Sequence, residues 1–170
     1  MSSLNSVIKN IRNYMRMDPG ISGDAQRIEQ ISWLLFLKIY DAKESDWAFN
    51  DEGYESIIPE KFRWRNWAKG DKSPTGDELL HFVNDELFPA LKSLPVTAST
   101  SVRKSIVRSV FDDTNQYMKD GIQLYKVIKE IDGINFTATR PPTLLRKFTR
   151  YFCENFRARG VPESFTRPVP

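Results

Sequence analysis

Residues 24–44 read DAQRIEQISWLLFLKIYDAKE, and this stretch decides the fold. Its middle is apolar nearly all round, whereas a helix at a protein surface carries an apolar stripe on one side only. The apolar positions are Ile28, Ile31, Leu34, Leu35, Leu37, Ile39 and Tyr40. We therefore predict a helix that begins near Ser22 or Asp24, either of which can cap it, and runs to about Glu44 as the central helix of the core.

The residues before this stretch carry a second helical pattern. Between Ser3 and Met17 the apolar side chains recur at steps of three and four, the spacing of one face of an amphipathic helix. These side chains are Leu4, Val7, Ile8, Ile11, Tyr14 and Met15. Pro19 and Gly20 follow, so we predict that the helix ends there in a turn.

Residues 46–75 lack the regular apolar spacing of the two helices predicted before them. Aromatic residues are scattered through them without sustained periodicity, and glycine and proline interrupt them at Gly53, Pro59, Gly70 and Pro74. We predict an irregular excursion that its aromatic side chains pin to the core. Alternation over 62–65 leaves a small hairpin as an alternative. Tryptophans between arginines also occur on surfaces that stack bases, but anchoring to the core is the favoured interpretation.

Three further helical patterns complete the chain up to about residue 133. Residues 76–94 carry apolar side chains at helical spacing, and we expect Pro89 to kink or split that helix. Ser101 can cap the next helix, and Asp120 can open a last one that Gly133 closes. Together the patterns predict an all-α bundle of five or six helices with one long irregular insertion.

Length and composition narrow the class of protein. The 170 residues, 40% hydrophobic and 28% charged, suit one globular domain, or a smaller domain with a tail. No basic segment followed by an apolar run opens the chain, and the most apolar stretch, 31–40, is too short to span a bilayer. We therefore expect a cytoplasmic protein without a membrane partner. Cys153 is the single cysteine and His81 the single histidine, which excludes an internal disulfide and zinc patterns built on Cys and His.

No set of residues predicts a catalytic, cofactor or metal site in this chain. A stand-alone enzyme needs a converging nucleophile, base and charge stabiliser, or a bound metal or cofactor. Gly20 and Gly23 do not follow a strand, so we predict that they shape a turn between helices rather than a phosphate loop. His81 lies beside apolar residues and is predicted to be a hydrogen-bonded boundary residue. Asp112 and Asp113 adjoin a helix end, where carboxylates cap or meet solvent.

Basic residues cluster, although the net charge is only +3. Nucleic-acid affinity depends on the phosphates neutralised at one surface, so their distribution matters more than their sum. The alternative for each cluster is a solvated helix face. A group near the C-terminal end comprises Arg140, Arg146, Lys147, Arg150, Arg157 and Arg159. The candidate phosphate contacts that we select are Lys9, Arg12, Arg16, Arg103, Lys104 and Arg108.

Several ordered segments resemble one known family, the modification subunits of type I restriction-modification systems. GISGDAQRIEQISWLLFLKIYD (20–41) resembles the early core helix of that family. FRWRNWAK (62–69) and GDELLHFVNDELFPALK (76–92) resemble its tryptophan segment and following helix. The stretch from VFDDTN to IDGINF (110–136) resembles the last helices before its catalytic domain. The likeness covers about residues 5–136.

The resemblance implies a domain arrangement and a set of partners. Residues 1–138 would form the helical N-terminal domain, and 139–170 would precede a methyltransferase domain that this chain lacks. In the family that Rossmann-like domain binds S-adenosylmethionine and methylates the exocyclic amine of adenine, so this chain alone would hold no cofactor and be inert. Two modification subunits join one specificity subunit, with a restriction subunit in the full complex. The helical domain helps close this assembly around double-stranded DNA.

The end of the chain departs from the family. Where the family has a segment like GEFYTPRA, this chain ends in PESFTRPVP (162–170). Codons built from the third base of one residue and the first two of the next allow these residues to encode GEFYTPRA. We therefore hypothesise a frameshift near residues 138–142. The alternative takes the tail at face value, as a basic amphipathic helix that Thr143 caps and Gly160 ends.

The sequence is compatible with three functions. The resemblance favours an assembly and DNA-clamping domain of a type I adenine-specific DNA methyltransferase subunit. The second is a helical protein-interaction module that does not contact DNA. The third, an independent helix-turn-helix regulator, is weaker, because the central helix is too apolar to offer a recognition face to a DNA groove.

Overall fold

The computed structural model describes residues 3–97 and 102–135, and this part of the chain is helical with no strand. The longer helices are α1 (Leu4–Arg16), α2 (Asp24–Asn50), α6 (Val102–Asp112) and α7 (Gly121–Asp132). The shorter α-helical elements are α3 (Trp64–Trp67), α4 (Gly76–His81) and α5 (Phe88–Lys92). A π-helical segment, η3 (Phe82–Leu87), joins α4 to α5, and two single 3-10 turns are η1 (Glu60–Phe62) and η2 (Gly70–Lys72). The predicted all-α bundle is confirmed.

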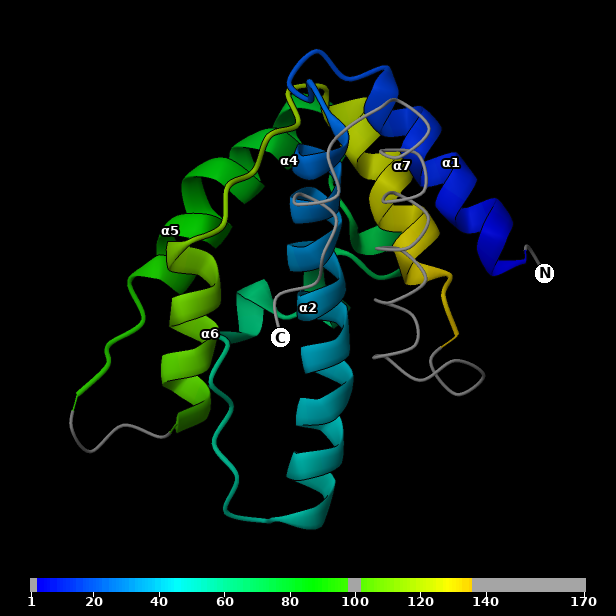
Figure 1. The fold of residues 1–170 in the computed structure, drawn as a ribbon. Helices are drawn as coiled ribbons and strands as arrows, with labels where there is room; N and C mark the ends of the chain where they lie inside the picture. The colour runs from blue at the N-terminus through cyan, green and yellow to red at the C-terminus, as the bar shows by residue number, and fades with distance from the viewer. Residues whose placement is uncertain (1–2, 98–101, 136–170) are drawn as a thin grey trace, which may run out of the picture.

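Helix α2 runs through the middle of the molecule, with two helical layers around it (Figure 1). Helices α1 and α7 pack against each other on one side, and α7 also contacts α4 and α2. Helices α5 and α6 pack together on the other side. Most of the buried side chains of α2 lie between Asp24 and Tyr40, and the apolar ones include Ile31, Trp33, Leu34, Leu35 and Leu37. The prediction of a central helix is confirmed.

Both predicted boundaries of the central helix need correction. The N-cap is Gly23, which makes no side-chain cap bond, whereas Asp24 is the first helical residue and forms a buried ion pair with Arg27. Ser22 is not the cap either, because its amide and hydroxyl both donate to the side chain of Gln26. At the other end the helix continues past Glu44 to Asn50. Its last turns are mostly exposed, so they carry no apolar period, yet no glycine or proline interrupts them.

The segment from 51 to 75 is irregular and pinned by aromatic side chains, as predicted. Trp64 and Trp67 are each only 3% exposed and contact one another at 5.5 Å between ring centroids. Both indole N–H groups are satisfied, by Asp132 and by the carbonyl of Phe62. Anchoring of the tryptophans is therefore confirmed, whereas the hairpin alternative is wrong, because 64–67 form a helical turn.

Pro89 lies in the continuous helical segment formed by α4, η3 and α5. It changes the helix type within this segment but does not end the segment. A proline lacks the N–H for a bond to the carbonyl four residues earlier and its ring clashes with that carbonyl. The chain meets this constraint by widening to the π-helix η3, in which the amide of Phe88 reaches back five residues to the carbonyl of Val83. The predicted kink or split thus takes the form of a change in helical pitch.

The last two predicted helices are also present. The side chain of Asp120 caps α7 by accepting from the amides of Ile122 and Gln123. Gly133 follows α7 in a right-handed conformation (φ −73°) rather than the left-handed one common at glycine caps. The start of α7 lies so close to the start of α4 that a Cβ at Gly121 would overlap the backbone of Gly76.

Several predictions fall outside the described residues. These are the cap at Ser101, the boundary at 138, the tail helix from Thr143 to Gly160, the frameshift near 138–142 and the C-terminal arginine group.

Candidate functional site

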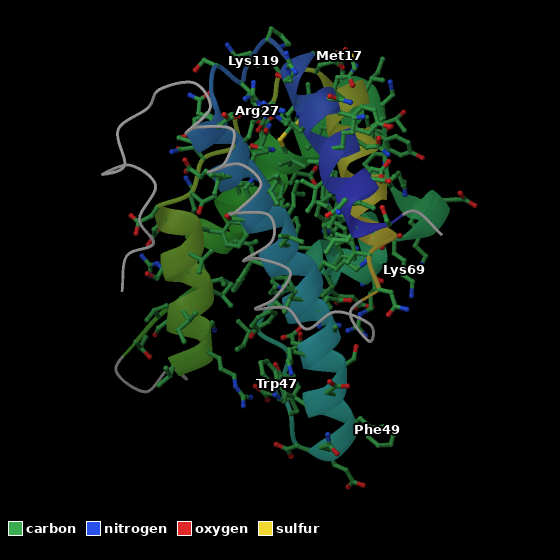
Figure 2. All side chains as sticks on the ribbon, turned by 45° about the vertical axis from the view of Figure 1, so that its right-hand side comes forward. Met17, Arg27, Trp47, Phe49, Lys69 and Lys119 are labelled. Carbon is green, nitrogen blue, oxygen red and sulfur yellow. The ribbon has the colours of Figure 1, made fainter. Side chains whose placement is uncertain are left out.

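The six candidate phosphate contacts form two groups on opposite sides of the molecule. Lys9, Arg12 and Arg16 lie on α1, and Arg103, Lys104 and Arg108 lie on α6. Helix α2 stands between α1 and α6 in both views (Figures 1 and 2). The structure therefore brings each group together within itself, but it does not join the two groups into one continuous basic surface.

Helix α1 presents a polar face without acidic residues. Its apolar side, formed by Val7, Ile8, Ile11 and Met15, is buried. Lys9 and Arg16 are exposed and form no ion pair with any described residue, whereas Arg12 is half-buried. The remaining exposed side chains of α1 are Asn5, Ser6 and Asn13. Every fully exposed side chain of α1 can thus donate a hydrogen bond, which suits a surface for phosphate oxygens.

Neighbouring α7 adds one cation and one anion beside α1. The ammonium group of Lys126 lies 5.5 Å from the ring centroid of Tyr14. Glu130 accepts a hydrogen bond of 3.0 Å from the side-chain amide of Asn10. The net charge of α1 together with Lys126 and Glu130 is therefore positive, and the carboxylate of Glu130 already accepts a hydrogen bond.

Helix α6 holds its cations differently, because Arg103 and Arg108 contact groups elsewhere in the chain. The guanidinium of Arg103 lies 3.9 Å from the ring centroid of Trp47, near the end of α2. Arg108 donates to the carbonyl of Leu94 at 3.3 Å and lies 3.8 Å from Asp112. Sequence reasoning missed Trp47 as a partner, because it ended the central helix at Glu44; the absence of glycine and proline before Gly53 is the signal that points to the longer helix.

A pocket of about 560 Å³ lies next to Arg103. One wall is the connection after α2, including Asp51, Tyr54 and Glu55, and the other is the first turn of α6. Its lining is mixed in charge, since two carboxylates face Arg103 and Lys104 across it. A single polyanion would meet repulsion from one wall, so the pocket does not suit a phosphate group.

The buried carboxylate of Glu44 fixes the pocket wall. Glu44 is 3% exposed and accepts from the hydroxyls of Tyr54 and Ser56 and from the amide of Ile57, at 2.8 to 3.0 Å. Burial, followed by the hydrogen bond to Glu44, raises the pKa of Tyr54. Burial also raises the pKa of Tyr40, one turn before Glu44. The connection after α2 is therefore held by one buried side chain that accepts from three donors.

A second buried carboxylate organises the opposite end of the bundle. Asp18 is 3% exposed and accepts from the amides of Gly20, Lys119 and Asp120 at 2.7 to 3.1 Å. A Cβ at Gly20 would overlap the carbonyl of Tyr117, so the two connections need a glycine there. The predicted turn role of Gly20 is confirmed. The side chain of Gln30, fully buried on α2, accepts from the amide of Tyr117 at 2.9 Å. Helix α2 is thereby also bonded to the connection between α6 and α7.

Lys38 joins α2 to the end of α7. Its ammonium group donates to the carbonyls of Ile131 and Asp132 at the end of α7, and to that of Ile134 just after it. Burial lowers the pKa of Lys38 to about 8, and the nearby carboxylate of Asp132 partly offsets this effect. The chain leaves the described bundle next to this contact, at Asn135.

The predicted non-catalytic residues lie at the surface. His81 is exposed, and its Nδ1 is 2.7 Å from the carboxylate of Asp85, one turn later in η3. Asp112 and Asp113 are exposed at the end of α6. Within residues 3–97 and 102–135, no three His, Cys, Asp or Glu side chains are grouped so that they could hold a metal ion. Over the same ranges, no helix combines the length and the apolarity that crossing a bilayer requires.

The charge of the described bundle is close to balance. Its two ranges contain 18 lysines and arginines and 20 aspartates and glutamates, whereas residues 136–170 contain seven and two. The excess of basic residues in the chain thus comes from its C-terminal part. Among the four longer helices of the described part, α1 alone carries no carboxylate.

Comparison with known proteins places this helical bundle in a family. The sequence model of the HsdM N-terminal domain matches residues 4–131, and the chain belongs to that family. It is 39% identical over 166 residues to the methylase subunit of the type I restriction enzyme EcoEI of Escherichia coli. That alignment covers 98% of this chain and 34% of the relative, so the chain spans about a third of the length of the curated protein that it matches.

Two solved structures share the fold. One is a protein of Vibrio vulnificus YJ016 assigned as the modification subunit of a type I restriction enzyme, with a TM-score of 0.78 and 28% identity over 92% of this chain and 35% of that one. The other comes from work on complex assembly and conformational transition of the type I restriction-modification system, with a TM-score of 0.76 and 31% identity. It is matched by 94% of this chain over 32% of its own length. The family resemblance inferred from the sequence is confirmed.

Proposed function

We propose that this chain acts as the assembly and DNA-clamping domain of a type I modification subunit, within a longer protein that methylates adenine in DNA. The observation that carries the proposal is the family match over residues 4–131, together with the similarity of nearly the whole chain to about a third of a methylase subunit's length. Residues 1–138 are the domain in this proposal, and 139–170 connect it to the methyltransferase domain.

The cofactor of the longer protein is S-adenosylmethionine in this proposal, and its site lies outside this chain. A Rossmann-type site needs a glycine-rich turn between a strand and a helix. The described residues contain no strand, and Gly20 and Gly23 sit between two helices. The described residues therefore do not fit the cofactor, and in this proposal the domain contributes to methylation by holding the complex together and the DNA in place.

The α1 face is the surface that we assign to the DNA backbone. Its exposed cations, Lys9 and Arg16, would neutralise phosphates, and its asparagines would donate to phosphate oxygens. Such contacts fix the position of the protein on DNA and carry no sequence information, which leaves target choice to the specificity subunit. The partners in this proposal are that subunit, a second modification subunit, the restriction subunit and double-stranded DNA.

The test mixes the chain with the matching specificity subunit and a DNA duplex, and measures DNA affinity at several salt concentrations. Replacing Lys9 and Arg16 by alanine should weaken DNA binding about tenfold at low salt and reduce the salt slope by about two, one for each phosphate that is no longer neutralised. The control replaces Lys43 and Lys72, two exposed lysines elsewhere, and should leave the slope unchanged. An unchanged slope in the α1 variant would contradict DNA binding by this face.

The second candidate function, a helical protein-interaction module without DNA contact, also has an observation in its favour. The described bundle carries slightly more acidic than basic residues, which does not steer a molecule towards DNA. If the chain joins the specificity subunit and all basic variants leave DNA affinity unchanged, this candidate replaces DNA clamping and the assembly role remains.

A further inference from the structure

We draw no further inference here: the strongest candidate, the exposed apolar side of α6 at Val102 and Ile106, carries nothing because nothing in the structure shows what covers it.

Discussion

The two ends of α2 are held in place by different means. Over its first four turns the helix packs against other helices, and the buried side chain of Gln30 accepts from the amide of Tyr117 in the connection before α7. Over its last turns, from Asp41 to Asn50, most side chains meet solvent, and the main attachments are the carboxylate of Glu44 and the ion pair of Asp41 with Arg65 at 2.9 Å. Figure 2 shows Phe49 directed outward at that end. One end therefore belongs to the cooperative core, whereas the other is a projection that can loosen locally.

Among the polar side chains, the largest effect on stability is expected at the buried end. Asp18→Ala leaves the amides of Gly20, Lys119 and Asp120 without their acceptor in a buried position. We expect a loss of about 3 kcal/mol in the free energy of unfolding, measured by urea denaturation. Asp113→Ala removes an exposed carboxylate from the connection between α6 and α7, to which Asp18 is bonded, and should change stability by less than about 0.5 kcal/mol. Equal losses in the two variants would show that the buried carboxylate has no special role.

Lys38, midway along α2, should have a smaller effect on the free energy of unfolding, and this effect should depend on pH. Burial lowers the pKa of Lys38 to about 8, so above that pH the folded chain has released the proton that the unfolded chain still binds up to about pH 10.5. Stability should therefore rise between pH 8 and pH 9.5, by about 2 kcal/mol for one proton. The window ends near pH 10, because burial raises the pKa of Tyr40 and of Tyr54 and stability falls as the unfolded chain ionises. In Lys38→Met the rise should vanish, and a rise of the same size in that variant would refute the assignment.

At the projecting end the effect should be local. Glu44→Gln keeps the shape of the side chain but turns one acceptor oxygen into a donor, so a hydrogen bond from the Ser56 hydroxyl or from Tyr54 and Ile57 is lost. We expect a loss of about 1 kcal/mol and faster amide exchange over 53–58, with unchanged exchange in α7. Faster exchange throughout the bundle would show that the two ends of α2 unfold together and would remove the contrast between them.

The same contrast explains how far the sequence predicts this structure. The buried part of α2 follows from its apolar residues, and the flanking amphipathic helices follow from theirs, because burial requires those patterns. The last turns of α2 are not buried, so they leave no pattern, and the sequence does not predict that Trp47 pairs with Arg103. The π-helix before Pro89 is predicted only as a kink, since the sequence indicates that a hydrogen bond is lost but not how the backbone compensates.

The candidate site also has features that the sequence predicts and features that only the fold provides. The sequence indicates which side chains are cationic, and the resemblance indicates a family, but neither places α1 and α6 on opposite sides of α2. The assignment of Arg103 and Arg108 to partners within the chain also depends on tertiary contacts between segments distant in sequence. The division of the cationic side chains between an open surface on α1 and contacts within the chain on α6 therefore needed the fold.

The smallest effect is expected from Phe49, and it is the sharpest test of the projecting end. The side chain is 89% exposed, so Phe49→Ser removes almost no buried area and should change the free energy of unfolding by less than about 0.5 kcal/mol. The matched change within the helix is Leu37→Ser, at 1% exposure on the same helix, for which we expect a loss of about 3 kcal/mol or more, the cost of a large core cavity lined with a polar group. Urea denaturation of both variants measures the gradient along one helix. A large loss at Phe49 would mean that another part of the chain covers this end of α2, and the projection would then belong to the core.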